Sequence, residues 1–380
     1  MAERFNNNLI DSSGDFIKIL MLFFILPVLI SNGQYKAFAG NAVDSLFSKW
    51  YEAKWTCDSS ESNPWQMKNI WNAYNTAEVI LDYTSATGDT SYLSETIHFL
   101  DCINSFHNAK YSGYDDAQWA AITYIKAYRL TGKDEYLSKA EEICNYIESE
   151  ARNTTSCGGI WWDLEKKHLV TITNELFLML ATMLYIDTKQ QSYLSFALEE
   201  WEWFKNSGLI AKETSGRQIK YLINDGLTRS CENNNGITWT YNQGVILGGL
   251  TNLWKITGDE ELLTLAINIA DAVIQNLNVK GILKEPVHFP LNTDQQQFKG
   301  IFVRYLIYMI QSLPDKYTDK KKEFSEFIIR NADHVLSHYS NLLFPEYWSN
   351  NNEFENKLTS ITQTSGIDLI IAAYLVQSAK

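Results

Sequence analysis

Two adjacent acidic residues, Asp115 and Asp116, are the strongest candidates for chemistry in the sequence. They begin a nearly uncharged segment, residues 115–130, whose only other charges are Lys126 and Arg129. A single Asp suffices as a helix N-cap, and negative charge there interacts favourably with the helix dipole. A second adjacent Asp adds repulsion between like charges, so capping alone does not explain the pair. We therefore expect both carboxyl groups to face an enclosed cleft.

The spacing of the pair suits cleavage of a glycosidic bond. Adjacent Cα atoms lie about 3.8 Å apart, so diverging side chains can place their carboxyls at the roughly 5–5.5 Å of retaining glycosidases. The separation of about 6.5–9.5 Å in inverting enzymes is harder to reach. In the retaining mechanism one Asp stays ionised and attacks the anomeric carbon. The other, kept protonated by burial and by its charged neighbour, donates to the leaving oxygen.

The segments around the pair predict an all-α fold. A Thr-Gly turn recurs at residues 87–88, 131–132 and 257–258. Segments such as 241–256, with one charged residue, alternate with segments such as 134–150, with seven. Nearly uncharged helices are buried on all sides, whereas helices with many charges keep one face in water. This alternation predicts an (α/α)6 toroid of six inner and six outer helices, with loops at one end lining a central cleft. A solenoid of the same pairs would need capping helices and a long exposed face, and we find neither.

The twelve helices can be placed along the chain from this pattern. The expected inner helices span residues 68–87, 115–131, 173–187, 241–257, 298–312 and 365–379. The expected outer helices span residues 41–55, 91–109, 134–150, 191–205, 259–276 and 321–340.

The N-terminal segment 1–39 has the pattern of a signal peptide and a short lead, followed by a single catalytic domain at 40–380. The apolar run 19–30 has 12 residues, whereas a spanning helix needs about 20. Cleavage after Gly33 or after Ala39 fits equally well. We expect a secreted protein with no stable membrane span in its mature form, and an uncleaved signal anchor that tethers it to the membrane is the alternative.

Composition narrows the function further. With 32 basic and 45 acidic residues, the formal net charge of −13 speaks against nucleic-acid binding. Five cysteines without C-x-x-C spacing allow up to two disulfides and one thiol, and they do not form a zinc motif. We therefore expect no zinc site built from these cysteines. The 12 Trp and 21 Tyr suit a cleft that binds hydroxylated rings. Asn153 begins the sequon Asn-Thr-Thr, a candidate site of N-glycosylation. Separately, we expect the protein to be a monomer.

The run YDDAQW at residues 114–119 resembles the signature of glycoside hydrolase family 76, the endo-α-1,6-mannanases. Further motifs follow in that family's order: GGIWWD at 158–163, TNEL at 173–176, WTYNQG at 239–244, FKGIFVR at 298–304 and QTSG at 363–366. The resemblance covers roughly residues 40–380. It implies an enzyme that cleaves α-1,6-linked mannose chains with retention, without metal or cofactor. In that reading Asp115 is the nucleophile and Asp116 the general acid/base.

The same motifs, the predicted helix starts and the run INDG at residues 223–226 supply candidates for substrate binding. They are Gln118, Trp119, Trp161, Trp162, Asn174, Asp225, Tyr241, Asn242, Gln243 and Lys299. Each has an alternative role. The Trp side chains can belong to the core, the polar residues at helix starts can be caps, Asp225 can form an Asp-Gly turn, and Lys299, like Arg304, can pair with carboxylates at the rim.

Other functions remain open at the level of sequence. A transglycosylase acting on cell-wall or GPI-type mannose glycans needs the same carboxylate pair. The presence of Cys157 and Cys231 beside two of the motifs resembles the pattern of the family's eukaryotic cell-wall branch. A non-catalytic glycan-binding protein would keep the aromatic cleft. A sugar epimerase would favour His at the start of an inner helix, where the sequence has none.

Overall fold

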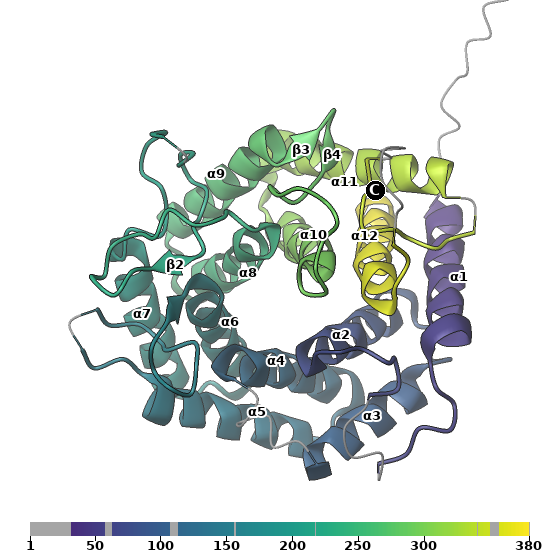
Figure 1. Cartoon of the computed structure of the whole chain (residues 1–380), viewed down its shortest axis with the longest axis horizontal. Coiled ribbons are helices and arrows are strands. Elements are labelled where there is room, and N and C mark those ends of the chain that lie inside the picture. Colours follow the sequence, from purple (N-terminus) through teal and green to yellow (C-terminus); the bar gives the residue numbers. More distant parts are fainter. Residues whose placement is uncertain are drawn as a thin grey trace, which may run out of the picture. The chain divides into compact units, whose positions relative to one another are not determined.

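The computed structural model describes residues 32–57, 63–106, 113–155, 157–216, 218–339, 341–349 and 357–379. Residues 31–380 form one compact unit, and the apolar run at 19–30 lies outside the described residues. In this part of the chain, alternate helices form an inner and an outer ring (Figure 1). The inner helices are α2 (Ile70–Thr87), α4 (Tyr114–Thr131), α6 (Thr171–Thr188), α8 (Thr240–Thr257), α10 (Gln295–Ser312) and α12 (Ser360–Ser378). The outer helices are α1 (Asn32–Trp50), α3 (Leu93–Phe106), α5 (Asp134–Tyr146), α7 (Gln191–Asn206), α9 (Glu260–Asn276) and α11 (Thr318–His338).

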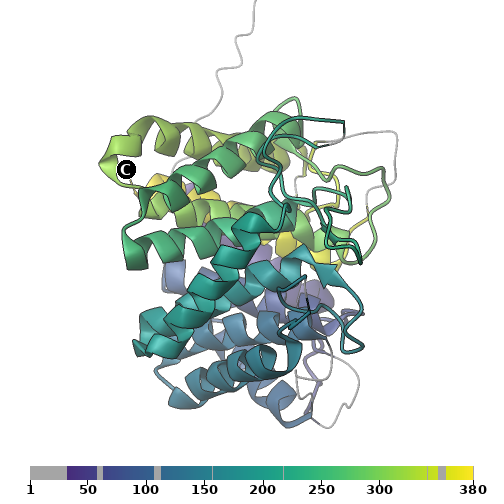
Figure 2. The same cartoon turned by 90° about the vertical axis from the view of Figure 1, so that its left-hand side faces the viewer.

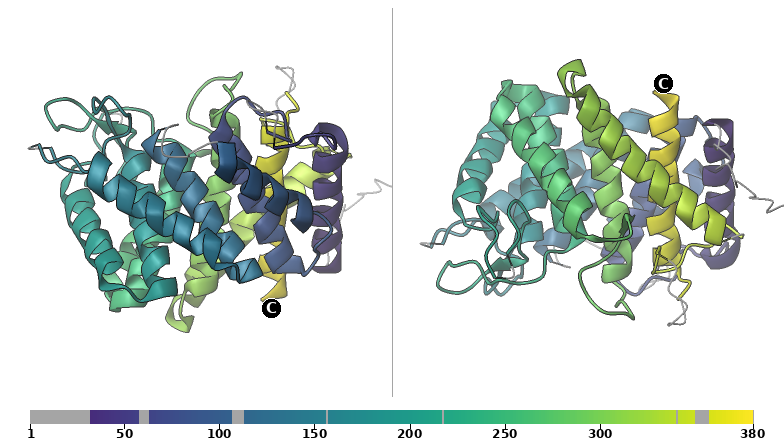
Figure 3. Two further views of the ribbon diagram at one scale, coloured as in Figure 1. Left: turned by 90° about the horizontal axis from the view of Figure 1, so that it is seen from below. Right: turned by 90° about the horizontal axis from the view of Figure 1, so that it is seen from above.

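The inner ring is closed. Each inner helix packs against the next, and α12 packs against both α10 and α2. Closure confirms the predicted (α/α)6 toroid and excludes the solenoid. The long loops of the chain gather at one end of the ring, and the C-terminus lies at the other (Figures 2 and 3).

Short elements complete the fold. A π-helical turn, η2 (Ile147–Ala151), extends α5, and a 3-10 turn, η3 (Asp315–Tyr317), precedes α11. Strand β1 (Leu169–Val170) pairs antiparallel with β2 (Gly226–Leu227), and β3 (Asn278–Val279) pairs with β4 (Ile282–Leu283). The β1–β2 pair joins two loops at the start of α6, which matters for the site below.

Burial follows the two compositions. Inner helix α6 is buried continuously from Thr171 to Leu184, as expected for a helix without a charged face. Outer helix α5 buries only Tyr136, Ala140, Ile143 and Cys144, which lie three or four residues apart on one face. The different composition of the two helix types therefore reflects how many neighbours each helix has.

The recurring Thr-Gly turn ends three inner helices. Gly88, Gly132 and Gly258 have φ of 75°, 72° and 76°, the left-handed conformation that ends many helices and that glycine adopts without strain. The preceding Thr bonds back into its helix: the Thr131 hydroxyl donates to the Ala127 carbonyl at 2.7 Å. After Thr188, Lys189 occupies the same position with φ of 59°.

Helix α1 begins earlier than predicted, at Asn32 and not near residue 41. The sequence of this stretch contains Gly33 and Gly40 and so has low helix propensity, but packing stabilises it. The Tyr35 side chain is fully buried and its hydroxyl donates to Asp333. The predicted boundary between residues 39 and 40 thus falls inside a helix. Cleavage after Ala39 would remove Tyr35 from the domain, whereas cleavage after Gly33 would retain it.

Ion pairs link the inner helices to one another in the interior. Arg304 pairs with Glu78 at 2.5 Å and with Asp368 at 2.9 Å, and Lys126 pairs with Glu78 and Asp82, both at 2.7 Å. Arg304 therefore pairs with carboxylates as predicted, but in the interior and not at the rim. A cavity of about 460 Å³ lies here among the C-terminal halves of the inner helices, and it is lined by none of the predicted site residues.

Candidate active site

Asp115 and Asp116 lie in the first turn of α4, and both side chains are partly exposed. Gly113, the residue immediately before α4, has φ of 145°, a conformation that favours glycine. The Asp115 carboxylate accepts a hydrogen bond from Trp162 Nε1 at 2.8 Å. Backbone N–H groups of Asp115 and Asp116 also donate to it. One carboxylate of the pair is therefore well supplied with donors.

The two carboxyls differ in their electrostatics. Burial raises the pKa of Asp115 to about 6, against the lowering effect of Trp162 and the backbone N–H groups. Burial raises the pKa of Asp116 well above its usual range, and the charges of Asp115 and Asp294 add to the increase. Above about pH 6 the preferred state of the pair has Asp115 ionised and Asp116 protonated.

Trp162 reaches Asp115 from the loop between η2 and β1. This loop is fixed at several points: Trp161 N donates to the Ala151 carbonyl at 2.9 Å, and Tyr114 N donates to the Trp162 carbonyl at 3.3 Å. The Trp162 ring is 39% exposed, so its face is open while its N–H is held. The Trp161 side chain is partly exposed.

Two further contacts hold the base of that loop. A disulfide joins Cys157 to Cys231, in the loop that leads to Trp239. The Asn153 side chain of the sequon is almost fully buried and donates to the Gly158 carbonyl at 2.9 Å. The amide that a glycan would modify is therefore used inside the fold.

Asp225 is brought to the start of α6 by the β1–β2 pair. Val170 pairs with Gly226, and Thr171 N donates to the Asp225 carbonyl at 2.8 Å. Gly226 lies in β2, so the alternative of an Asp-Gly turn is wrong. Burial raises the pKa of Asp225 to about 6, against a lowering effect of the neighbouring Trp239 and Asn242 side chains.

Tyr241 lies among these acids. Its ring stacks on Phe298, with centroids 3.8 Å apart and an interplanar angle of 8°. Burial raises the pKa of its hydroxyl, and the charges of Asp225 and Asp115 raise it further, followed by those of Glu175 and Asp294. We refer to Tyr241 and the acids Asp115, Asp116, Glu175, Asp225 and Asp294 as the carboxyl cluster.

Three amides predicted to bind substrate are fully buried and hold backbone instead. Gln118 Nε2 donates to the carbonyls of Tyr114 and Thr173, both at 3.1 Å. Asn174 accepts from Ile160 N at 2.7 Å. Gln243 accepts from Ile223 N at 2.9 Å and donates to the Ile223 carbonyl at 2.9 Å. Gln118 thus links α4 to α6, whereas Asn174 and Gln243 fix the loops that carry Trp162 and Asp225. These contacts to the protein are indirect with respect to a ligand.

Trp119 and Lys299 also lie away from the exposed surface of the cluster. Trp119 is buried and stacks against Trp71, with centroids 6.0 Å apart. Lys299 is buried, and its Nζ donates to the Glu346 carbonyl at 2.8 Å. Burial lowers the pKa of Lys299 to about 8, opposed by the charges of Glu285 and Glu346. Lys299 thus interacts with carboxylates, but in the interior.

Comparison with known proteins decides the family. The model of glycosyl hydrolase family 76 matches residues 34–380. The chain belongs to this family. A mannan endo-1,6-alpha-mannosidase of Candida albicans is 26% identical over 50% of this chain and 45% of its own length. A mannan endo-1,6-alpha-mannosidase of Saccharomyces cerevisiae is 26% identical over 64% of this chain and 58% of its own length. The chain thus spans only about half the length of these curated relatives.

Solved structures of family 76 share the fold. An α-1,6-mannanase of Salegentibacter sp. HEL1_6, in an inactive variant with two consecutive aspartates replaced by asparagine, binds α-1,6-mannotriose. It is 24% identical with a TM-score of 0.76, over 90% of this chain and 99% of that one. Dfg5 of Chaetomium thermophilum, in complex with glucosamine, is 17% identical with a TM-score of 0.70, over 92% and 90%.

Sequence reasoning missed two acids of the carboxyl cluster. Asp294 is partly exposed, and its Oδ1 accepts from Asn69 Nδ2 at 2.7 Å and from Trp71 Nε1 at 2.9 Å. Its sequence neighbourhood carries no signal beyond an acid before a helix. Glu175 was visible as one of two charged residues, with Asp187, in the apolar segment 173–187, but only its neighbour Asn174 was chosen.

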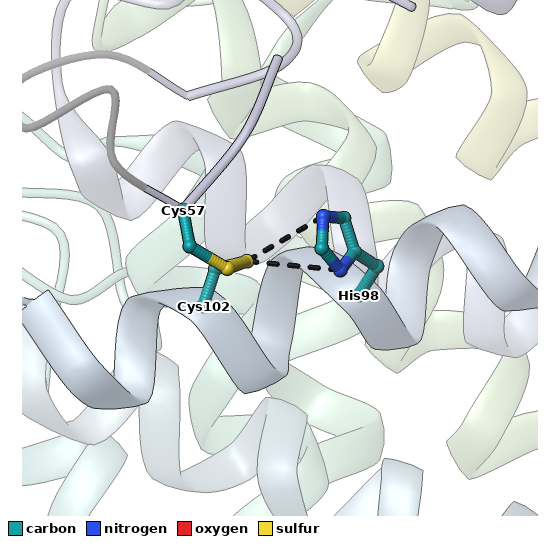
Figure 4. Close-up of side chains that lie close together, drawn as sticks. All are labelled: Cys57, His98 and Cys102. Atoms are coloured by element: carbon teal, nitrogen blue, oxygen red, sulfur yellow. Dashed lines mark hydrogen bonds between the residues drawn. A yellow bond between two sulfur atoms is a disulfide. The ribbon is translucent and has the colours of Figure 1, made fainter. Parts of the chain in front are cut away.

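The cysteines form two disulfides and one thiol, as the sequence allowed. The bonds are Cys57–Cys102 and Cys157–Cys231, and Cys144 is a buried thiol. Within the described ranges, the one group spaced for a metal ion is Cys57, His98 and Cys102 (Figure 4). Two of its three residues are joined in a disulfide, whereas zinc binds thiolates. The group is therefore a cross-link with a neighbouring histidine.

Proposed function

We propose that this chain is a retaining glycosidase that cleaves α-1,6-mannosidic bonds in mannan-type glycans. The observation that carries the proposal is the asymmetry of the Asp pair: Asp115 accepts from Trp162 and from backbone N–H groups, whereas burial and the charge of Asp115 raise the pKa of Asp116. A retaining mechanism needs one ionised and one protonated carboxyl side by side. The Salegentibacter variant supports the proposal, because replacing two consecutive aspartates inactivates that α-1,6-mannanase.

The reaction then runs in two displacements. The Asp115 carboxylate forms a bond to the anomeric carbon as the glycosidic C–O bond breaks, and the Asp116 proton moves to the leaving oxygen. Asp116, now ionised, takes a proton from water. The resulting hydroxide oxygen attacks the anomeric carbon, and the bond to Asp115 breaks. Both carboxyls return to their starting states, and the configuration is retained.

The rest of the cluster would bind the sugar. Asp225 and Tyr241 offer polar groups beside the pair, and the open face of Trp162 suits stacking on a pyranose ring. Asn242 is buried beside Asp225, and neither its amide nitrogen nor its amide oxygen has a hydrogen-bond partner, so its amide is free to meet a sugar hydroxyl.

Export of the protein through a secretory route, by means of residues 1–39, is part of the proposal. Two disulfides support it, because such bonds persist in oxidising compartments. No helix within the described residues is long and apolar enough to cross a membrane.

The test is incubation with a linear α-1,6-mannooligosaccharide, with product size and anomeric form followed by NMR. We expect shorter mannooligosaccharides released first as the α anomer. Release of the β anomer first would contradict the mechanism, and an intact oligosaccharide would contradict the substrate. Longer products in the presence of an acceptor sugar would show that transfer competes with hydrolysis.

A further inference from the structure

Glu175 is a buried acid that the mechanism above does not use. Its side chain is 0% exposed, and neither carboxyl oxygen has a hydrogen-bond partner. An ionised carboxylate without partners in such a place is costly, and buried groups of this kind become neutral instead. An unpartnered acid in the second turn of an inner helix needs a reason.

The backbone places Glu175 beside Asp225. Thr171 N, at the start of α6, donates to the Asp225 carbonyl at 2.8 Å. Glu175 follows Thr171 by four residues, so it lies one turn further along the same face of α6. The Asp225 charge raises the pKa of Glu175, after the larger effect of burial. Asp225 is thus tied to the helix face that carries Glu175.

The other elements around α6 provide no cation to Glu175. From α8, Tyr241 interacts with Glu175 as a neutral hydroxyl. On the side of η2 and α7, Arg152 lies over the Phe177 ring but pairs with Glu148 and Glu200, both at 2.6 Å. From α4, Asp115 acts on Tyr241, whereas the charge that acts on Glu175 itself is that of Asp225. Every described charge that faces this side of α6 is therefore either negative or already paired.

We propose that Glu175 is a positioning residue that stays protonated beside Asp225, so that the two carboxyls carry one negative charge, located on Asp225 and available to sugar hydroxyls. The inference rests on the proposed function, because it assigns Asp225 to substrate binding. If Glu175 also ionised at alkaline pH, the two carboxylates would repel each other, and Asp225 would be pushed out of the position in which it meets the sugar hydroxyls. Saccharide binding would then weaken as Glu175 loses its proton.

The first test needs no substrate. Gln has the shape of a protonated Glu but does not titrate, so the melting temperature of Glu175→Gln is compared with that of the native chain from pH 4 to pH 9. A folded-state pKa above the unfolded value means that the native chain loses stability as pH rises. The advantage of Glu175→Gln must therefore grow with pH above about 4.5. A difference that is constant with pH overturns the proposal.

Glu200→Gln is the matched control, because Glu200 is equally buried but pairs with Arg152 at 2.6 Å. Burial raises the pKa of Glu200 to about 7 against the charge of Arg152, so Glu200 is ionised and paired at pH 9. Removing one partner of a buried pair is destabilising, so this variant should melt below the native chain at pH 9. If Glu175→Gln behaves like it, Glu175 is ionised and the proposal is wrong.

The second test measures position and not stability. The affinity for α-1,6-mannotriose is measured by calorimetry with the D115N/D116N variant. In this variant the catalytic pair no longer ionises, so the pair adds no pH dependence of its own. Adding Glu175→Gln should keep the affinity within about twofold near pH 6 and reduce its decline at alkaline pH. A tenfold loss of affinity, or an unchanged alkaline decline, overturns the positioning role. If the D115N/D116N parent does not bind the trisaccharide, the proposed substrate fails, and the melting series still decides whether Glu175 is protonated.

Discussion

The indole N–H of Trp162 donates a 2.8 Å hydrogen bond to the carboxylate of Asp115. Because it favours the charged form, this bond opposes the rise in pKa that burial causes. Asp116 receives no comparable support, and its pKa rises further because its neighbour is charged. Asp115 and Asp116 are adjacent in sequence, and their positions alone do not distinguish them. The hydrogen bond from Trp162, which lies 47 residues away in sequence, does.

Trp162→Phe tests this bond. Loss of the N–H raises the pKa of Asp115 above about 6, so the acid limb of the kcat/KM profile should move to higher pH, with roughly a tenfold loss at pH 6. Kinetics on an α-1,6-mannooligosaccharide from pH 4 to pH 9 measures this. Trp161→Phe, in the same loop, is the control and should leave the limb in place. Identical profiles for the native chain and Trp162→Phe would show that the bond has no effect on Asp115.

Replacing the pair should stabilise the fold near neutral pH. The folded-state pKa of Asp115, about 6, is above its usual value of 3.8, so the stability that Asp115 contributes at low pH is lost as the pH rises through this range. Asn does not titrate. D115N/D116N should therefore melt about 2–5 °C above the native chain at pH 7, with a smaller difference at pH 4. Calorimetry at both pH values checks this, and an equal difference at both would rule out the raised pKa.

The disulfide between Cys157 and Cys231 should affect catalysis as well as stability, because it joins the loop of Trp162 to the loop that leads to Trp239. Substituting both residues with Ser should destabilise by about 4 kcal/mol and lower kcat. Substituting Cys57 and Cys102 with Ser is the control. This variant should also lose about 4 kcal/mol of stability, but its kcat should be unchanged at temperatures where it is folded. Equal kcat for the two variants would exclude a role for the first bond in the site.

Gly244 should not tolerate a side chain. A Cβ there would lie 2.6 Å from Phe302 Cα, which is backbone of the neighbouring inner helix and cannot rotate away. Gly244→Ala should destabilise by about 1–3 kcal/mol, measured by chemical denaturation. At Gly40 the nearest atom is the Tyr83 hydroxyl at 3.1 Å, the end of a side chain, so Gly40→Ala should cost less. The reverse order would contradict this packing of α8 against α10.

Most of the fold could be predicted from the sequence, because the number of neighbours of a helix determines its composition. The observed α4 (Tyr114–Thr131) and α8 (Thr240–Thr257) each begin one residue from the expected start. The start of α1 could not be predicted, since the packing of Tyr35 and its bond to Asp333 are tertiary interactions.

The site could be predicted only in part. The positions of Asp115 and Asp225 followed from helix starts and motifs. However, an amide at a helix start can bind a ligand, cap the helix or hold a loop, and sequence position is the same in each case. Gln118 holds the start of α6 and Gln243 holds a loop, through backbone contacts made only in the folded chain. Asp294 was missed for the same reason, because its partners Asn69 and Trp71 lie more than 220 residues away.

The central claim is that Asp115 attacks the sugar while Asp116 donates the proton. A fluorinated mannosyl donor with a good leaving group, incubated with the native chain, should accumulate the glycosyl-enzyme, and mass spectrometry of the digested protein locates the bond. The account predicts that the mannosyl group is attached to Asp115. Attachment to Asp116, or turnover of the donor with an inverted product and no labelled peptide, would contradict it.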